Sequence, residues 1–150
     1  MITYFDASSI VKWFFEESYS DLAEQARVEA DFAVTSLIAF PEVLSAMRRA
    51  WKEGRCSESE MTFARSEFLR VWGDLTWIRP SEGLVLETQS LIFVHGLRGY
   101  DAVHLASALV LKREAETEIR FSCFDRTLNR AASLEGLHIH RDLIAEPREE

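Results

Sequence analysis

Four acidic residues of this chain lie where apolar runs meet polar turns or helix starts: Asp6, Glu42, Asp101 and Asp125. Their surroundings read ITYFDASSIV, LIAFPEVLSA, RGYDAVHLASAL and IRFSCFDRTL. Burying a lone carboxylate beside such apolar sequence costs several kcal/mol. Converging carboxylates also repel one another unless a metal ion holds them. The four acids therefore predict one shared site with a compensating cation.

The donor atoms of this predicted site indicate which metal it suits. Carboxylate oxygens without a Cys/His cluster favour Mg²⁺, with Mn²⁺ as a substitute, over zinc. Magnesium keeps several waters and is usually held by one or two carboxylates together with substrate phosphate. Four acids therefore suffice for two ions, or for one ion with outer support. Bound in this way, the metal activates water and stabilises charge on phosphoryl oxygens, which is the chemistry of phosphodiester hydrolysis.

Each acid also has a purely structural interpretation. Asp101 and Asp125 are both placed to cap the helix that follows, an interaction that contributes about 1 kcal/mol. Asp6 follows a predicted strand and has no obvious structural role beyond turn formation. Glu42 is the hardest to explain structurally, because its neighbours on the helix are uncharged and mostly apolar. These neighbours, three and four positions away, are Ile38, Ala39, Ser45 and Ala46.

The composition is that of one globular domain over residues 1–150, with 145–150 as a frayed tail. Apolar residues make up 47% of the chain, enough for a sizeable core. No apolar stretch reaches membrane-spanning length and the N-terminus lacks a signal-peptide pattern, so no membrane association is expected. Cys56 and Cys123 suggest no disulfide framework, and a cytoplasmic location is expected.

The net charge of −8 argues against a protein that coats nucleic acid through bulk electrostatics. It does not exclude a nuclease, whose clustered acids carry part of that charge and are neutralised by bound metal. The basic residues are also grouped behind two of the acids. Arg48, Arg49, Lys52 and Arg55 follow Glu42, and Arg126 and Arg130 follow Asp125.

Apolar strands and helices alternate along the chain. Strands are predicted over 2–5, 32–34, 75–79 and 119–124, with 137–140 as a fifth candidate. Helices are predicted over 10–15 behind a Ser8 or Ser9 cap, 19–29, 35–52, 58–72, 82–94, 101–111 and 127–134. Pro41 predicts a bend or a later start in the third of these helices. The alternation indicates an α/β fold with a parallel, helix-flanked sheet, and all four acids are expected at the carboxyl edge of its strands.

Four segments together resemble the PIN-domain ribonucleases, particularly the VapC-type toxins of prokaryotic toxin–antitoxin pairs. They are YFDASSIVKWF, PEV at 41–43 with Ala46 and Arg48-Arg49 behind it, RGYDAVHLA at 98–106 and FDRTL at 124–128. Each segment alone is weak, but four in the family's order span nearly the whole chain. One departure is Cys123, because the family commonly carries Thr or Ser two residues before the last acid. Ser122 is an imperfect substitute for that hydrogen-bonding group.

The resemblance implies a three-layer α/β/α fold with a short-stranded central parallel sheet. It also implies a metal-dependent endoribonuclease that acts as a toxin on RNA, leaves a 5′-phosphate and a 3′-hydroxyl, pairs with a cognate antitoxin protein and forms a homodimer. Asp6 and Asp101 are the first-choice metal ligands. Glu42 is expected to bind metal or orient the attacking water, and Asp125 to bind a second ion or act through water. Ser8 is placed to hydrogen-bond a carboxylate or the scissile phosphate.

Other functional classes stay open at this point. One alternative is a catalytically silent PIN-like module that binds RNA or protein, although all four acids are present. A haloacid-dehalogenase-like phosphatase would need a second Asp two residues after the first, where Ser8 stands, and a receiver domain would need paired acids near the start. His104, three residues after Asp101, is interpreted as a packing residue. His138 and His140 are interpreted as surface or core side chains.

Overall fold

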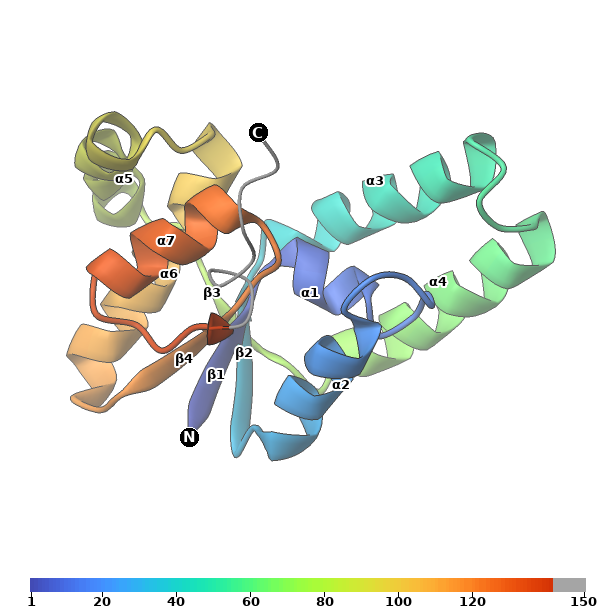
Figure 1. Cartoon of the computed structure of the whole chain (residues 1–150), viewed down its shortest axis with the longest axis horizontal. Coiled ribbons are helices and arrows are strands. Elements are labelled where there is room, and N and C mark those ends of the chain that lie inside the picture. Colours follow the sequence, from blue (N-terminus) through green and yellow to red (C-terminus); the bar gives the residue numbers. More distant parts are fainter. Residues whose placement is uncertain (142–150) are drawn as a thin grey trace.

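A four-stranded parallel sheet runs through the centre of the computed structural model, which describes residues 1–141 (Figure 1). Its strands are β1 (Ile2–Phe5), β2 (Phe32–Ser36), β3 (Thr76–Ile78) and β4 (Ile119–Ser122). They are ordered β3-β2-β1-β4, so β1 lies in the interior of the sheet. Ile2 pairs with Phe32 on one side and with Ile119 on the other. The carboxyl ends of these three strands therefore meet at one edge.

Two groups of helices cover the two faces of the sheet (Figure 1). The first group is α1 (Ala7–Val11), α2 (Ser20–Glu29), α3 (Ala39–Lys52) and α4 (Glu58–Trp72). The second group is α5 (Glu82–His95), α6 (Gly99–Ala115) and α7 (Arg126–Leu134). Every connection between successive strands passes through helices, as parallel pairing requires. The predicted three-layer α/β/α arrangement is confirmed.

The alternation of side chains along β1 divides the hydrophobic core in two. Tyr4 and Phe5 are both fully buried and belong to different core clusters. Tyr4 packs with apolar residues of the α5–α7 layer, including Leu105 and Leu128, whereas Phe5 packs with those of the α1–α4 layer, including Phe68. Burial on both faces explains why the first strand is an almost unbroken apolar run.

Side-chain caps define where several helices begin. Ser57 and Glu60 form the capping box predicted for α4. The first helix is capped by Asp6, which has extended backbone and accepts from the Ser9 N–H. The prediction that Ser8 or Ser9 caps this helix is therefore wrong, and the helix starts earlier than expected.

The start of α3 is later than the hydrophobic pattern alone predicts. The strand β2 continues to Ser36, and Leu37 N–H then donates to the Ile78 carbonyl on β3. Only at Ala39 does the helix begin. This start places Pro41 in the first turn, where its missing N–H costs no helical hydrogen bond, as the alternative of a later start anticipates.

Asp101 and Asp125 are both predicted as helix caps, but the structure gives them different positions. The helix begins at Gly99, with Arg98 as an N-cap that makes no side-chain capping bond. Asp101 thus lies inside the first turn, and the interpretation of Asp101 as a cap is wrong. Asp125 does cap α7, because its Oδ1 accepts from Leu128 N–H at 2.8 Å.

The C-terminal predictions have mixed outcomes. In the part of the chain that the structure describes, residues 137–140 form no strand and contribute one parallel bridge, between Arg120 and His138. The predicted tail over 145–150 lies outside the described residues. Across residues 1–141, no helix is both long enough and apolar enough to cross a membrane.

Candidate active site

Asp6 lies at the carboxyl end of the interior strand β1 and is held by neighbouring hydrogen-bond donors. It is only 4% exposed. Its Oδ1 accepts from Ser9 N–H at 2.9 Å, and Ser8 Oγ lies 2.7 and 2.9 Å from the two carboxylate oxygens. The Asp6 N–H donates to the Ser122 carbonyl at 3.2 Å, which ties the residue to β4. The hydrogen bond predicted between Ser8 and a carboxylate is thus present, but none of these donors carries a charge.

Glu42 reaches the same region from α3 through a chain of hydrogen bonds. Its Oε1 lies 2.7 Å from His104 Nε2, and His104 Nδ1 lies 2.7 Å from the Tyr4 hydroxyl. The imidazole ring connects the two groups, because its Nε2 lies within hydrogen-bond distance of the carboxylate and its Nδ1 within hydrogen-bond distance of the Tyr4 hydroxyl. Within residues 1–141 no other hydrogen bond to the Glu42 side chain is formed, so its Oε2 is free to bind water or metal.

The interpretation of His104 as a packing residue is correct for its burial but missed its hydrogen bonds to Glu42 and Tyr4. It is 1% exposed, as a packing residue would be, but both of its ring nitrogens are engaged in hydrogen bonds. Its position three residues after Asp101 was the available signal, because residues three apart share a helix face. His104 therefore aligns the Glu42 carboxylate from the opposite helical layer.

The remaining two acids approach from α6 and from the loop after β4. Asp101 has a side chain that is 17% exposed, and its Oδ2 accepts from Arg98 Nε at 3.3 Å. Asp125 is half-buried and uses one oxygen to cap α7. The capping role of Asp125 leaves its second carboxylate oxygen available, so capping and metal binding are compatible.

Cys123 and Ser122 do not supply the hydrogen bond to the last acid that the family commonly has. The Cys123 thiol lies 3.7 Å from the backbone carbonyl of Asp125, not from its carboxylate. Ser122 Oγ is instead within hydrogen-bond distance of Ser9 Oγ at 2.7 Å and His140 Nε2 at 2.9 Å. With Cys123 at this position, no side chain of residue 122 or 123 donates to the Asp125 carboxylate. The thiol instead contacts the backbone of the turn at the Asp125 carbonyl.

The environment of Asp6 disfavours its charged form. Burial raises the pKa of Asp6 from 3.8 to about 6. The charge of His104 and the hydrogen bonds from Ser8 and Ser9 lower this pKa, whereas the charge of Asp101 raises it. Desolvation outweighs the local donors, so the folded protein holds this carboxylate in a state that a cation would stabilise.

Electrostatic interactions connect Asp6 with Asp101, and Asp101 with Asp125. Burial raises the pKa of Asp101, and the charge of Asp125 raises it further. Burial also raises the pKa of Tyr4, with added contributions from the charges of Asp6 and Glu42. Asp6 is thus coupled to Asp101, and Asp101 to Asp125, while Glu42 is linked through Tyr4 and His104. The convergence of all four acids on one metal site stays a prediction.

Among the described residues, the four acids do not form a closed ligand shell. Within residues 1–141, no three His, Cys, Asp or Glu side chains are grouped closely enough to hold a metal ion together. The donors fit Mg²⁺ in kind, because they are carboxylate oxygens partly removed from water and mutually repelling. Magnesium usually takes one or two carboxylates and completes its shell with water and substrate phosphate, so a pair of these acids suffices.

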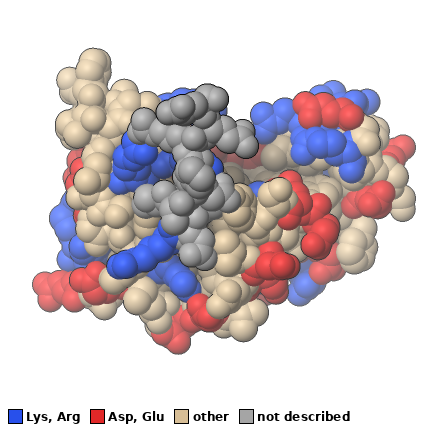
Figure 2. Space-filling model, in the orientation of Figure 1, with Lys and Arg blue, Asp and Glu red and all other residues tan. Residues whose placement is uncertain are grey.

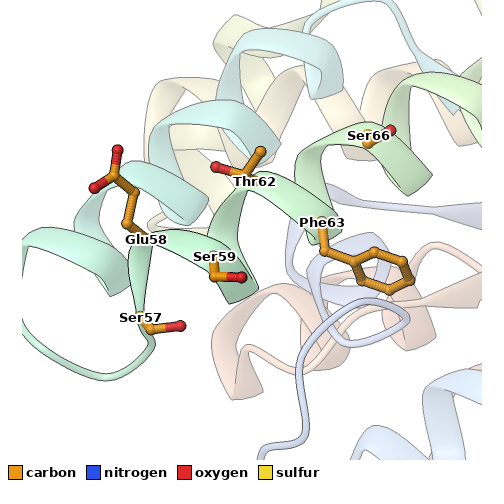
Figure 3. A pocket seen from close by; sticks show the side chains of 6 residues that line it. All are labelled: Ser57, Glu58, Ser59, Thr62, Phe63 and Ser66. Atoms are coloured by element: carbon orange, nitrogen blue, oxygen red, sulfur yellow. The ribbon is translucent and has the colours of Figure 1, made fainter.

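Surface features away from the four acids are less specific. Figure 2 shows Lys and Arg side chains interspersed with Asp and Glu, with a basic group over α3 and further basic groups on the opposite side of the molecule. An open depression runs along α4 (Figure 3). It is lined by Ser57, Glu58, Ser59, Thr62, Phe63 and Ser66. All of these come from one helix and its N-cap, and none of the four acids is among them.

A model of the PIN domain family matches residues 3–134. The chain belongs to the PIN domain family. Ribonuclease VapC45 of Mycobacterium tuberculosis (strain CDC 1551 / Oshkosh) is 32% identical over 138 residues, which are 92% of this chain and 94% of the relative. Ribonuclease VapC49 of Mycobacterium tuberculosis (strain ATCC 25618 / H37Rv) matches with the same values. These relatives place this PIN domain among the VapC-type members.

Solved structures share the fold at low sequence identity. Mycobacterium tuberculosis VapC20, a toxin that cleaves the sarcin-ricin loop, aligns with a TM-score of 0.63 and 15% identity over 90% of this PIN domain and 95% of that chain. PAE2754 from Pyrobaculum aerophilum aligns with a TM-score of 0.63 and 16% identity over 97% of both chains. The three-layer fold is therefore that of PIN-domain proteins.

Asp6→Asn is expected to stabilise the metal-free protein at alkaline pH. A pKa raised by folding means that the folded state holds the proton more tightly, so the wild type loses stability as the pH rises from 3.8 through about 6. Asn keeps the helix cap without the buried charge. Urea denaturation in EDTA should show the variant more stable by about 3 kcal/mol near about pH 8, and by about 1 kcal/mol near about pH 4.5.

Asp74→Asn is the matched control, because Asp74 is exposed in the turn before β3. It should show no pH-dependent difference from the wild type. A stability gap for the Asp6 variant that stays equal at both pH values would contradict the assigned burial of charge.

His104→Ala is expected to lower the free energy of unfolding by about 2–4 kcal/mol. The substitution leaves a cavity and removes the partner of the Tyr4 hydroxyl in a buried position. His138→Ala is the control, because the His138 side chain is 47% exposed and its change should stay within about 0.5 kcal/mol. Thermal or urea unfolding of both variants measures the difference, and equal losses would refute the buried hydrogen-bond chain.

Proposed function

We propose that this PIN domain is a Mg²⁺-dependent endoribonuclease, with Mn²⁺ as a substitute, and that it acts as the toxin of a toxin–antitoxin pair. The single observation that carries the metal requirement is the burial of Asp6 beside the charge of Asp101 at the carboxyl edge of the sheet. Two coupled carboxylates in a poorly solvated position need a cation, and RNA supplies the phosphate that completes the shell of such an ion.

In this proposal each acid has a separate task. Asp6 and Asp101 hold the ion, which when bound lowers the pKa of water and stabilises charge on the phosphoryl oxygens. Ser8 fixes the Asp6 carboxylate through its hydroxyl. Asp125 supports a second ion or acts through water, in keeping with its one free oxygen. The residues thus divide into direct ligands and groups that hold those ligands in place.

Glu42 orients the attacking water through Oε2, while His104 holds Oε1. In-line attack on the phosphorus forms a new bond to the water oxygen and breaks the bond to the 3′ oxygen, which takes up a proton. The products are a 5′-phosphate and a 3′-hydroxyl. His104 acts here as a positioning residue, because it touches Glu42 and not the substrate.

The VapC-type relatives support the biological setting that we propose. We propose RNA as substrate, a cognate antitoxin protein as the inhibiting partner, a homodimer as the assembly and the cytoplasm as the location. An open reading frame for a small protein next to this gene would support the antitoxin. The silent binding module stays the competing interpretation, and the metal titration below separates it from the nuclease.

Asp6→Asn and Asp101→Asn are each expected to lower the rate of RNA cleavage by about two orders of magnitude or more, the scale seen when a group that stabilises transition-state charge is removed. Gel analysis of an incubated RNA in the presence of Mg²⁺ measures the rate. Asp74→Asn is the control and should cleave like the wild type. Full activity in both site variants would refute the assignment.

Mn²⁺ is expected to bind the wild-type protein at one or two saturable sites in isothermal titration calorimetry. Asp6→Asn and Asp101→Asn should each weaken this binding about tenfold or more, because each removes a charged oxygen ligand. Asp74→Asn should leave the isotherm unchanged. A wild-type isotherm without saturation would favour the silent binding module over the nuclease.

A further inference from the structure

An acidic nuclease must bring a polyanion close to its own carboxylates, so local cations beside the acids matter more than the net charge of −8. Arg98 is such a cation. It immediately precedes α6, and its Nε donates to Asp101 Oδ2 at 3.3 Å. Its side chain is 82% exposed. The guanidinium group is therefore at the site and still open to solvent.

The contact to Asp101 uses little of the binding capacity of Arg98. A guanidinium group has five N–H donors in a planar fork that matches phosphate oxygens. One donor is used here, at a longer distance than the 2.8 Å bond from Arg120 to Glu29 on the surface. Within residues 1–141, the Arg98 side chain makes no other hydrogen bond or ion pair. Four donors are thus free for a ligand.

Tyr100 supplies an exposed aromatic surface two residues after this cation. It precedes Asp101 directly and is 66% exposed. In the part of the chain that the structure describes, its ring packs against no other aromatic ring and its hydroxyl has no hydrogen-bond partner. An exposed aromatic ring and an exposed cation at one helix start are the combination that binds single-stranded nucleic acid, because bases stack on the ring while the cation neutralises the backbone.

We propose that Arg98 and Tyr100 form an RNA subsite beside the cleaved bond, in which Arg98 binds a phosphate of the strand and Tyr100 stacks on an unpaired base. The inference rests on the proposed nuclease function and adds how the substrate is held. The occupant is single-stranded RNA, since stacked bases of a duplex would not offer a free face to Tyr100. Asp101 then links the two tasks, because it lies next to both residues and belongs to the four acids.

The helix α4 offers matched controls on the other face of the sheet from α6 (Figure 1). Arg70 is 65% exposed and pairs with Glu67 at 2.7 Å, three residues away, which is the spacing between Arg98 and Asp101. Phe63 is 70% exposed on the open side of the same helix (Figure 3). Substitution of either changes an exposed Arg or an exposed ring without touching the acids.

The test measures binding of a fluorescein-labelled single-stranded RNA oligonucleotide by anisotropy over a series of KCl concentrations with Mg²⁺ present. Every protein carries Asp6→Asn, so that the RNA stays uncut. Adding Arg98→Ala should reduce the slope of log Kd against log salt by about 0.7, the value for one phosphate contact on a single strand. Arg70→Ala should leave the slope unchanged.

Adding Tyr100→Ala should raise the Kd at least about fivefold with the salt slope preserved, because base stacking is not an ion-release contact. Tyr100→Phe should bind like the parent, and so should Phe63→Ala. If Arg98→Ala keeps the parental slope, or Tyr100→Ala the parental Kd, the subsite is refuted while the nuclease proposal stands. If the Asp6→Asn parent binds no RNA and the wild type cleaves none, the nuclease proposal itself fails.

Discussion

Desolvation of Asp6 is the constraint on which this site depends. The residue follows an interior strand that is buried on both faces, so its carboxylate has almost no access to water. The hydroxyl of Ser8 and the N–H of Ser9 reduce the penalty without removing it, and the pKa of Asp6 stays near about 6. A buried carboxylate in this position is stabilised in its charged form by a nearby cation. The negative charge of a neighbouring acid makes that stabilisation larger.

The parallel topology explains how acids far apart in sequence come to lie at the same edge of the sheet. An interior strand of a three-layer fold touches both helical layers: Tyr4 packs with the α5–α7 layer and Phe5 with the α1–α4 layer. The chain Tyr4–His104–Glu42 connects the strand with both layers through hydrogen bonds. One buried histidine thereby couples the sheet to Glu42, and the acids are positioned by the same contacts that hold the layers together.

A protein with a negative net charge can bind RNA, because the charges close to the bound strand matter more than the net charge of the whole molecule. Bound metal would neutralise part of the acid cluster, and Arg98 places an exposed cation next to Asp101. The basic group on α3 lies among acidic side chains (Figure 2). A nuclease built this way would hold RNA by a few placed contacts and not by bulk attraction.

The sequence by itself determined the alternation of strands and helices, the capping box at Ser57 and the identity of the four acids, because these depend on hydrophobic period and on local hydrogen-bond chemistry. Only the tertiary structure decided that α3 begins after Ser36 has paired in the sheet and that Asp101 is not a cap. It also decided that His104 holds Glu42, since that bond joins residues 62 positions apart. Local sequence encodes what neighbours along the chain can do. The packing of layers against β1 sets which distant side chains meet, and no periodic pattern carries that information.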